Sequence, residues 1–485
     1  MTDFLSLPLQ RIAEALRKRD LSARELVQAA LERHRELDER LHAYKVFDAE
    51  GALAAANQAD SVLSREAQPP PLCGIPYSAK DLYGARGLPT FAGTARQLPD
   101  VWSEDAWLVA RLRAQGAVLV GKTHTVELAF GGVGINPHWG TPLNPWDEKL
   151  PRIPGGSSCG AGVSLWEGSA LLALGTDTAG SIRIPASLTG TVGHKTTKGR
   201  WPTDGVVPLS GTFDSVGALA RSVEDSAYFF GAIDPAWGDP AKLLDALDGA
   251  EPSRLRIAVP RCAIWEDCQP DIADALRGAL AELSAAGAEI TEIDGSLLDE
   301  ANDLYMSGGI AASECHDFLG RELPGWLDSL HPIVGRRIEA AAKPLSDPAY
   351  LAALEAHRRL AAAAGSLFDA AARRFASAGG RFETTVLALP AGMVTPPAVG
   401  DLDDLARYGA VNAAVLRPTS PASMLGLCAV AMPVGLDAAG MPVGLQLIAP
   451  GGCDEAALGA ALAAERVLGT PRDRLGVPPA IRARG

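Results

Sequence analysis

PRIPGGSSCGAGVSL, residues 151–165, and GTDTAGSIRIPAS, residues 175–187, are two neighbouring stretches rich in glycine and serine. The first has no acid, histidine or lysine after Arg152, and the second begins where the apolar run SALLALGT (169–176) ends. Short apolar runs bounded by turn residues are typical of buried strands. The formation of turns alone does not explain two serine-bearing loops this close to a buried strand. They predict a chemical site on the loops of an α/β fold.

The rest of the chain alternates helical and strand patterns. Residues 8–65 predict helices, and Ser22 and Glu25 have the spacing of a capping box. Residues 74–220 carry short apolar runs separated by Gly, Pro, Ser and Thr, which favour buried strands, whereas residues 240–380 predict a mostly helical stretch. Strand patterns then return in VLALPA (386–391) and in a predicted hairpin, LCAVAMPVGL (427–436) and MPVGLQLIAP (441–450). These patterns favour one α/β unit with a helical insertion.

Composition and charge exclude several classes of function. The chain has 485 residues, is 47% hydrophobic and carries a formal charge of 44 − 58 = −14. An acidic chain lacks the basic surface that binding to a nucleic-acid backbone needs, so no direct nucleic-acid partner is expected. The first twenty residues do not resemble a secretory signal, and the longest apolar runs fall short of the roughly 18 residues of a membrane span. The sequence therefore predicts a soluble protein that does not bind membranes.

The seven cysteines are scattered and odd in number, and no two form a CxxC pair. This distribution favours buried free thiols in a reducing cytoplasm over disulfides or a zinc site. We expect a cytoplasmic protein that requires no metal and no cofactor.

The first stretch allows three interpretations. It forms a tight turn without chemistry, or it cradles a phosphate, or GSSCG (156–160) matches the GxSxG nucleophile elbow with Ser158 as nucleophile. A phosphate loop of the Walker type is excluded because no lysine follows these glycines before Lys195. The elbow needs a downstream acid and histidine. None of the available histidines lies in a glycine-rich loop, as a catalytic base would: His194, His316, His331 and His357.

A different base precedes both loops. GIPYSAKDLYG (74–84) places Lys80 among apolar and small residues. Such a lysine is either a surface residue with a buried stem or a buried base. Burial would lower its pKa from about 10.4 toward neutrality, a shift of ~3 units that desolvation supplies. A neutral lysine is a competent base.

Taken together, these motifs closely resemble the amidase signature family of serine hydrolases. The two loops, the Lys80 segment and residues 192–227 carry the resemblance, and the spacing 181 − 157 = 24 between Ser157 and Ser181 matches the catalytic serine pair of that family. Further matches are NPWD (144–147), PTSP (418–421) and MPVGLQLIAP (441–450). Only about 230–385 is unmatched in detail.

The resemblance implies a large twisted mixed β-sheet flanked by α-helices on both sides. It implies a single amidase domain over residues 1–485. Within that domain we expect four parts: N-terminal helices (1–66), a signature core with the catalytic loops (67–230), a mostly helical specificity segment (231–385), and a return to the core sheet with a C-terminal helix (386–485).

The resemblance also implies roles for individual residues. Ser181 corresponds to the nucleophile that forms an acyl-enzyme, Ser157 to the serine that bridges the proton, and Lys80 to the base. The family has a cis peptide bond before the bridging serine, here Gly156-Ser157. The oxyanion hole corresponds to the backbone N–H groups of Thr178, Ala179, Gly180 and Ser181.

Three further residues are expected to support the site. Ser158 becomes a supporting hydrogen-bonding residue, and Asp177 is expected to orient its loop and keep Lys80 and Ser158 in place. Arg183 either binds a substrate carboxylate or forms a buried ion pair, and the ion pair is favoured. The chain departs from the family at Ala179, where glycine is usual, and this extra methyl group is expected to trim the pocket.

The function that this resemblance implies is hydrolysis of the C–N bond of small aliphatic or aryl carboxamides. Cleavage of carbamates or esters is a close alternative, and the glutaminase (A) subunit of a tRNA-dependent amidotransferase is a second. The expected partner is a small-molecule amide or carbamate substrate, and a homodimer is compatible with the sequence. The leaving group is not encoded in any motif identified above.

Overall fold

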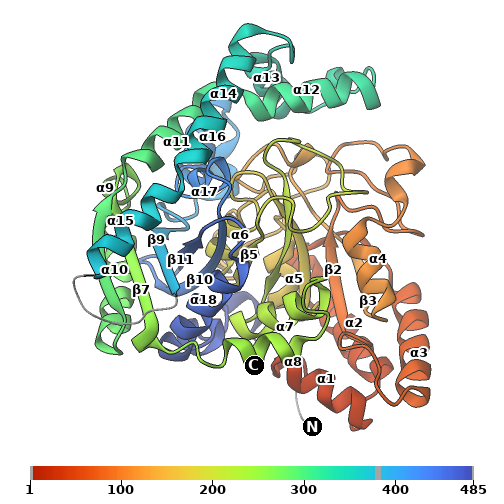
Figure 1. Ribbon diagram of the computed structural model, residues 1–485. Helices are drawn as coiled ribbons and strands as arrows, with labels where there is room; N and C mark the ends of the chain where they lie inside the picture. The colour runs from red at the N-terminus through yellow and green to blue at the C-terminus, as the bar shows by residue number, and fades with distance from the viewer. Residues whose placement is uncertain (1–3, 377–383, 483–485) are drawn as a thin grey trace.

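A computed structural model describes residues 4–376 and 384–482, and its core is one mixed sheet of eleven strands (Figure 1). The strands run in the order β1-β3-β2-β4-β6-β5-β10-β11-β9-β7-β8. Their bounds are β1 Tyr44–Phe47, β2 Pro76–Lys80, β3 Val118–Thr123, β4 Leu172–Asp177, β5 Val192–Lys195, β6 Ser215–Ala220, β7 Leu255–Arg261, β8 Glu289–Asp294, β9 Thr384–Pro390, β10 Cys428–Leu436 and β11 Pro442–Ala449. The predicted large mixed sheet is confirmed.

The centre of the sheet brings the sequence motifs together. β2 pairs in parallel with both β3 and β4, and β4 pairs antiparallel with β6. The predicted hairpin forms between β10 and β11, where Leu436 lies opposite Pro442. β2 ends at Lys80 and β4 ends at Asp177, so these two side chains lie at the same edge of a parallel pair.

Nineteen α-helices are present among the described residues. They are α1 Leu9–Lys18, α2 Ala23–Leu41, α3 Ala49–Arg65, α4 Trp107–Ala114, α5 Ala161–Glu167, α6 Arg183–Thr189, α7 Val223–Ile233, α8 Pro240–Leu247, α9 Ala263–Glu266, α10 Pro270–Ala285, α11 Ser296–Gly308, α12 Ile310–Glu322, α13 Pro332–Ala341, α14 Pro348–Ala363, α15 Gly365–Ala376, α16 Leu405–Leu416, α17 Ser420–Met424, α18 Asp454–Leu468 and α19 Pro471–Leu475. The predicted capping box is present at the start of α2, where Ser22 and Glu25 exchange hydrogen bonds.

Helices cover both faces of the sheet because successive strand residues point to opposite faces. Ala173, Leu219 and Ala431 point toward α5 and α6, with which they form one apolar cluster. The neighbours of these residues in each strand join the main core, which also includes side chains of α7 and α18. The strands are therefore buried on both sides, as the near-continuous apolar runs of the sequence indicated.

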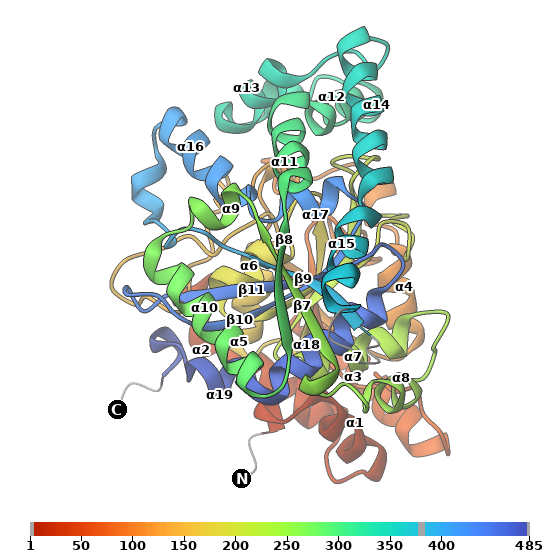
Figure 2. The same cartoon turned by 60° about the vertical axis from the view of Figure 1, so that its left-hand side comes forward.

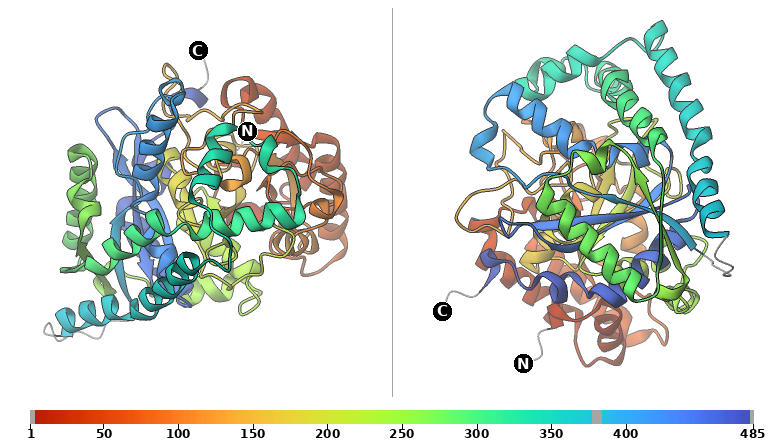
Figure 3. Two further views of the ribbon diagram at one scale, coloured as in Figure 1. Left: turned by 90° about the horizontal axis from the view of Figure 1, so that it is seen from above. Right: turned by 90° about the vertical axis from the view of Figure 1, so that its left-hand side faces the viewer.

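The described residues of the segment 231–385 are mostly helical, but they also contribute β7 and β8 to one end of the sheet (Figure 2). Its helices α11–α14 extend beyond the sheet, and seen from above they lie across the core loops (Figure 3). Hydrogen bonds join this helical cover to those loops at several places: His331 N to Glu127 Oε2 (3.0 Å), Arg337 Nη1 to Phe130 O (3.0 Å) and Arg96 Nη2 to Ser329 Oγ (3.0 Å). In addition, Glu314 of α12 accepts from Ser210 Oγ and from the backbone N–H and the hydroxyl of Thr212.

None of the helices in the described ranges combines the length and the apolar character that crossing a bilayer demands. All seven cysteines are free thiols, and six of them are buried. The predicted buried free thiols are therefore confirmed at six positions, and Cys453 is half-buried.

Candidate active site

Lys80 is the last residue of β2 and is completely buried. Its Nζ donates hydrogen bonds to Ser157 Oγ and to Thr176 Oγ1, each at 2.7 Å. Because β2 pairs with β4, the strand that carries Thr176, the sheet itself holds the amine in place. The structure thus brings two of the three expected catalytic side chains into direct contact.

Burial lowers the pKa of Lys80 to about 7, far below the usual value for lysine. The nearby Asp214 and Asp177 carboxylates act in the opposite direction but do not offset the loss of hydration. Near neutral pH a large fraction of the molecules therefore carries an uncharged amine at this position, and an uncharged amine accepts a proton.

The loop that carries Ser157 is held by the segment 126–134. The Gly156-Ser157 peptide bond is cis, as the resemblance implied. Gly156 N donates to Gly132 O (2.7 Å), and Val126 N donates to Ser157 O (3.1 Å). A Cβ atom on Gly156 would lie 2.8 Å from Gly134 N, so the close approach of these two backbones requires glycine at 156.

Ser181 lies beside this loop and is 4% exposed. Its carbonyl accepts a hydrogen bond from Ser158 N at 3.3 Å, which joins the two serine loops. Within residues 4–376 and 384–482, Ser181 Oγ forms no hydrogen bond, and the backbone N–H groups of Ala179, Gly180 and Ser181 donate none. A hydroxyl and three neighbouring N–H donors are therefore available to a bound molecule.

Two residues that the sequence analysis did not single out fix the Ser181 loop. Thr419 Oγ1 donates to Ala179 O (2.6 Å), and a Cβ atom on Gly180 would lie only 2.0 Å from that hydroxyl. On the other side, Thr178 Oγ1 donates to Asp214 Oδ1 (2.6 Å). Thr419 belongs to the quoted PTSP match, which was the available signal.

Asp177 and Arg183 form a completely buried ion pair, the favoured interpretation of Arg183. Arg183 also donates to Thr419 O, Gln446 Oε1 and Ser423 Oγ, at 2.8, 2.8 and 3.0 Å. Burial alone would raise the pKa of Asp177, but the guanidinium holds it below its usual value. The pair therefore stays charged and keeps the loop rigid.

Asp177 orients its loop by accepting a hydrogen bond from Ile182 N at 3.2 Å. Its carboxylate makes no hydrogen bond to Lys80 or Ser158 in the described part of the chain, so it does not hold these two side chains directly. Thr176 takes that place: its hydroxyl accepts from Lys80, and its carbonyl accepts from Ser158 Oγ at 3.5 Å.

The histidines do not support the alternative with Ser158 as nucleophile. His194 faces Asp454 at 3.5 Å, and the ring of His357 packs edge-on against Phe213. His331 caps the start of α13, and His316 is exposed. Across the described residues, Ser158 Oγ has a hydrogen bond to the Thr176 carbonyl and none to an imidazole.

One cationic side chain of the helical cover reaches the core loops. Arg337 of α13 is half-buried, donates to Phe130 O, and lies 4.9 Å from the Phe130 ring and 5.4 Å from the Tyr408 ring. No acid pairs with it in the part of the chain that the structure describes. Tyr408 packs in the same apolar cluster as Ala179, beside Ser181, and Tyr305 packs against that cluster.

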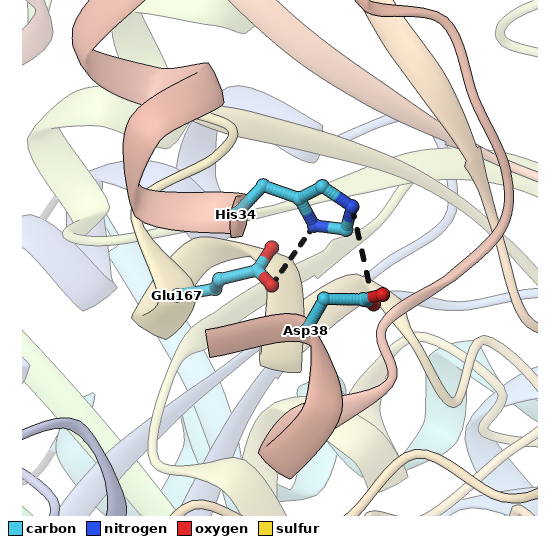
Figure 4. Close-up of side chains that lie close together, drawn as sticks. All are labelled: His34, Asp38 and Glu167. Carbon is cyan, nitrogen blue, oxygen red and sulfur yellow. Dashed lines mark hydrogen bonds and ion pairs between the residues drawn. The ribbon is translucent and has the colours of Figure 1, made fainter. Parts of the chain in front are cut away.

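His34, Asp38 and Glu167 form a cluster of metal-ligand type away from these loops (Figure 4). Nδ1 of His34 lies 3.1 Å from Glu167 Oε1, whereas Nε2 lies 3.9 Å from Asp38 Oδ1. The two carboxylates thus face different ring nitrogens, so each of them is already engaged with the imidazole. We regard this cluster as a hydrogen-bonding network with a structural role.

Comparisons with known proteins agree with the geometry. The sequence model of a family described as Amidase matches residues 25–458. The 2-amino-5-chloromuconic acid deaminase of Comamonas testosteroni is 44% identical over 473 residues, which cover 97% of this chain and 98% of that protein. One of the subunits of the glutamyl-tRNA(Gln) amidotransferase of Salinispora arenicola is 36% identical over 334 residues, covering 66% and 67% of the two chains. A crystal structure of an amidase superposes with a TM-score of 0.80 and 30% identity, covering 96% of this chain and 100% of that chain.

Proposed function

Because the chain belongs to the amidase family and is therefore an enzyme that hydrolyses amide C–N bonds, we propose that it does so through an acyl-enzyme on Ser181. Neutral Lys80 takes the proton of Ser157, and Ser157 takes the proton of Ser181. Ser181 Oγ then attacks the amide carbonyl carbon. The buried contact between Lys80 Nζ and Ser157 Oγ carries this proposal, because it pairs a base of suitable pKa with a hydroxyl.

The remaining steps follow from the groups around Ser181. The oxyanion of the tetrahedral intermediate accepts hydrogen bonds from the N–H groups of the Thr178, Ala179, Gly180 and Ser181 loop, donors worth about 3 kcal/mol in comparable sites. The proton returns from Lys80 through Ser157 to the leaving nitrogen, and the C–N bond breaks. Water then attacks the acyl-enzyme with the same base, which releases the carboxylic acid and restores Ser181.

A substrate panel tests the proposed reaction. Primary amides, anilides, carbamates and esters are assayed with the isolated chain, and release of ammonia or amine from a primary amide is the expected result. Faster turnover of carbamates than of amides would favour the alternative that the chain is a carbamate hydrolase. Absence of amide hydrolysis by correctly folded protein would exclude the proposal.

The similarity to one subunit of an amidotransferase raises the alternative that the chain is the glutaminase component of such a complex. A glutaminase component of that kind is expected to be nearly inert on simple amides without its partner subunits. Turnover of simple amides by the isolated chain, and no gain on adding such subunits, distinguishes the free hydrolase that we propose.

Replacement of Ser157 by alanine is expected to lower kcat by about a hundredfold to ten-thousandfold, the usual range for loss of a proton-transfer group. The loss is not complete, because a water molecule is able to replace part of the bridge. Steady-state kinetics measure the effect, and Ser164→Ala, a buried serine in α5, is the matched control. Activity equal to that of the parent would rule out the proton relay.

Arg337 indicates the class of substrate. A half-buried guanidinium without an acidic partner among the described residues, held beside aromatic rings and the Phe130 carbonyl, is suited to bind a carboxylate. The relative from Comamonas testosteroni acts on an acid, 2-amino-5-chloromuconic acid. We therefore infer that the preferred substrate carries a carboxylate in addition to the amide that is cleaved.

Replacement of Arg337 by glutamine is expected to raise the KM of an amide that bears a carboxylate by about 10- to 100-fold, because a charge-assisted hydrogen bond contributes about 1.5–3 kcal/mol. The KM of a neutral amide of similar size should change little. Arg336→Gln, at the neighbouring exposed position, is the matched control. Equal loss on both substrates would show that Arg337 acts on the fold and not on the substrate charge.

A further inference from the structure

A cavity of about 790 Å³ is lined by residues near both ends of the described chain, among them Leu5–Pro8 and Thr470–Asp473, and no residue of the proposed proton relay lines it. Its walls come from the 3₁₀ helix Phe4–Ser6, from α2, α5 and α19, and from the 3₁₀ helix Pro479–Ile481. This volume is within the range of about 300–1,000 Å³ that is typical of small-molecule sites.

One part of the wall is apolar. Leu5, Leu7, Leu165, Trp166 and Ile481 contribute side chains to it. The Trp166 indole is fixed by a hydrogen bond from Nε1 to Thr189 O (2.6 Å) and by an edge-to-face contact with Trp146. This part of the wall is suited to an aromatic or alkyl group.

The polar part of the wall favours an anion because its acids are already committed. Asp225 accepts from Leu9 N (2.6 Å) and from Arg221 (2.8 Å). Asp473 accepts from the backbone N–H and the hydroxyl of Thr470. Glu167 accepts from His34 and Ser169. Among the described residues, each of these lining acids already accepts two hydrogen bonds.

The lining arginines, in contrast, keep donors available. Arg221 uses its terminal nitrogens on Leu5 O, Leu7 O and Asp225, but its buried Nε has no acceptor among the described residues. Arg472 is exposed and pairs with no acid in the described ranges, and Arg482 binds only the Val477 carbonyl there. The cavity therefore combines an apolar wall with two guanidinium groups, those of Arg472 and Arg482, that pair with no acid of the described ranges.

The position of the cavity connects it with the serine loops. α5 begins just after Ser157 and Ser158 and ends at the cavity, where Leu165 to Gly168 line it. α6 begins two residues after Ser181, and its C-cap Gly190 lines the same cavity. Each helix has seven residues, so about 10 Å of rigid helix separates the cavity from each serine loop.

We propose that this cavity is a second binding site, for a small carboxylate with an apolar body, and that its occupant changes turnover through α5 and α6. The part of the proposal that concerns turnover rests on the proposed roles of Ser157 and Ser181. The part that concerns binding does not, because it is measured on protein that performs no reaction.

The experiment uses sodium 4-phenylbutyrate as the probe and its neutral analogue, 4-phenylbutan-1-ol, as the comparison. Titration calorimetry is performed on the full chain, on Arg472→Gln/Arg482→Gln, and on Arg337→Gln as the matched control near the serines. We expect the carboxylate to bind the parent with a Kd below about 1 mM. The double substitution is expected to weaken binding at least tenfold, while Arg337→Gln leaves this site unchanged.

Turnover of a neutral amide is then measured with and without saturating 4-phenylbutyrate. We expect kcat to change at least twofold in the parent and to stay constant in the double variant, whose basal kcat equals that of the parent.

No binding, equal affinity for the alcohol, or loss of binding only in Arg337→Gln would overturn the proposed site. Proven binding with unchanged kcat would overturn the coupling. Repeating the titration on Ser181→Ala keeps both outcomes separate from a failure of the proposed reaction.

Discussion

Replacement of Ser181 by alanine should reduce kcat by at least about ten-thousandfold, because loss of the nucleophile removes the covalent route entirely. The residual rate would come from binding and from the N–H donors of Ala179 and Gly180. Steady-state kinetics with a primary amide measure the loss. Substitution of a small, nearly buried hydroxyl is expected to leave the thermal unfolding temperature within a few degrees of that of the parent.

A fluorophosphonate probe tests the same assignment without a substrate. The parent should form one adduct, which peptide mass spectrometry locates at Ser181. Ser158→Ala is the matched control, because Ser158 occupies the GxSxG position but its hydroxyl hydrogen-bonds only to the Thr176 carbonyl among the described residues. That variant should keep most of its activity and its labelling. An adduct on Ser158 would contradict the assignment.

Replacement of Lys80 by methionine should lower kcat/KM by at least about a thousandfold, since no other side chain among the described residues contacts Ser157 Oγ as a base. In the parent, the pKa of Lys80 is about 7, so the amine is protonated below that pH. We therefore expect kcat/KM to fall about tenfold for each pH unit below pH 7 and to level off above it. A profile that stays flat down to pH 5 would rule out Lys80 as the base.

The lowered pKa of Lys80 also makes the stability of the fold depend on pH. In the unfolded chain Lys80 titrates near its usual pKa of about 10.4, so between about pH 7 and that value the unfolded state holds a proton that the folded state lacks. Burial of this lysine therefore destabilises the fold progressively as the pH falls through that window, and the cost is constant below it. Lys80→Met removes this effect. Its unfolding temperature at pH 7–8 should be at least as high as that of the parent, and marked unfolding of the variant would contradict the account.

Much of the site could be predicted from the sequence because its residues lie in contiguous motifs. Lys80, Ser157 and Ser181 lie in short motifs of small residues, two of them at the ends of buried strands, and β2 and β4 pair in the structure. The pattern of small residues around them marks places where backbones approach closely, as at Gly156 and Gly134. A local sequence pattern of this kind is therefore enough to predict where the chain forms a tightly packed loop.

The supporting contacts could not be predicted in the same way, because they join residues far apart in the chain. Thr419 meets Ala179 across 240 positions. Thr176 was quoted only as part of a strand, and its contact with Lys80 follows from strand pairing. Nothing in the local sequence specifies which distant hydroxyl or carboxylate will face a loop.

The strands β7 and β8 were also missed. β7 (LRIAVPR) and β8 (EITEID) are short and lie among helices rich in Ala and Leu, so the composition of the region favoured helix throughout. β8 is the last strand of the sheet and is mostly half-buried, so its apolar alternation is weak. Pairing with β9, more than a hundred residues further on, decides the conformation of β7.

Glycines allow α5 and α6 to pack closely against each other and against the sheet. This close packing limits which substitutions such enzymes tolerate during evolution. A methyl group on Gly162 would lie 2.1 Å from the Thr189 hydroxyl, and one on Gly193 would lie 2.7 Å from the Ala186 methyl. Almost any enlargement there would displace the helix that follows Ser181, so natural selection has little freedom beneath the reaction centre. New substrates are more readily acquired by exchanging the overlying α11–α14, which meet the core loops through individual side chains such as Glu314 and Arg337. Sequence changes in such a chain should therefore accumulate in α11–α14, while the residues between α5, α6 and the sheet change little.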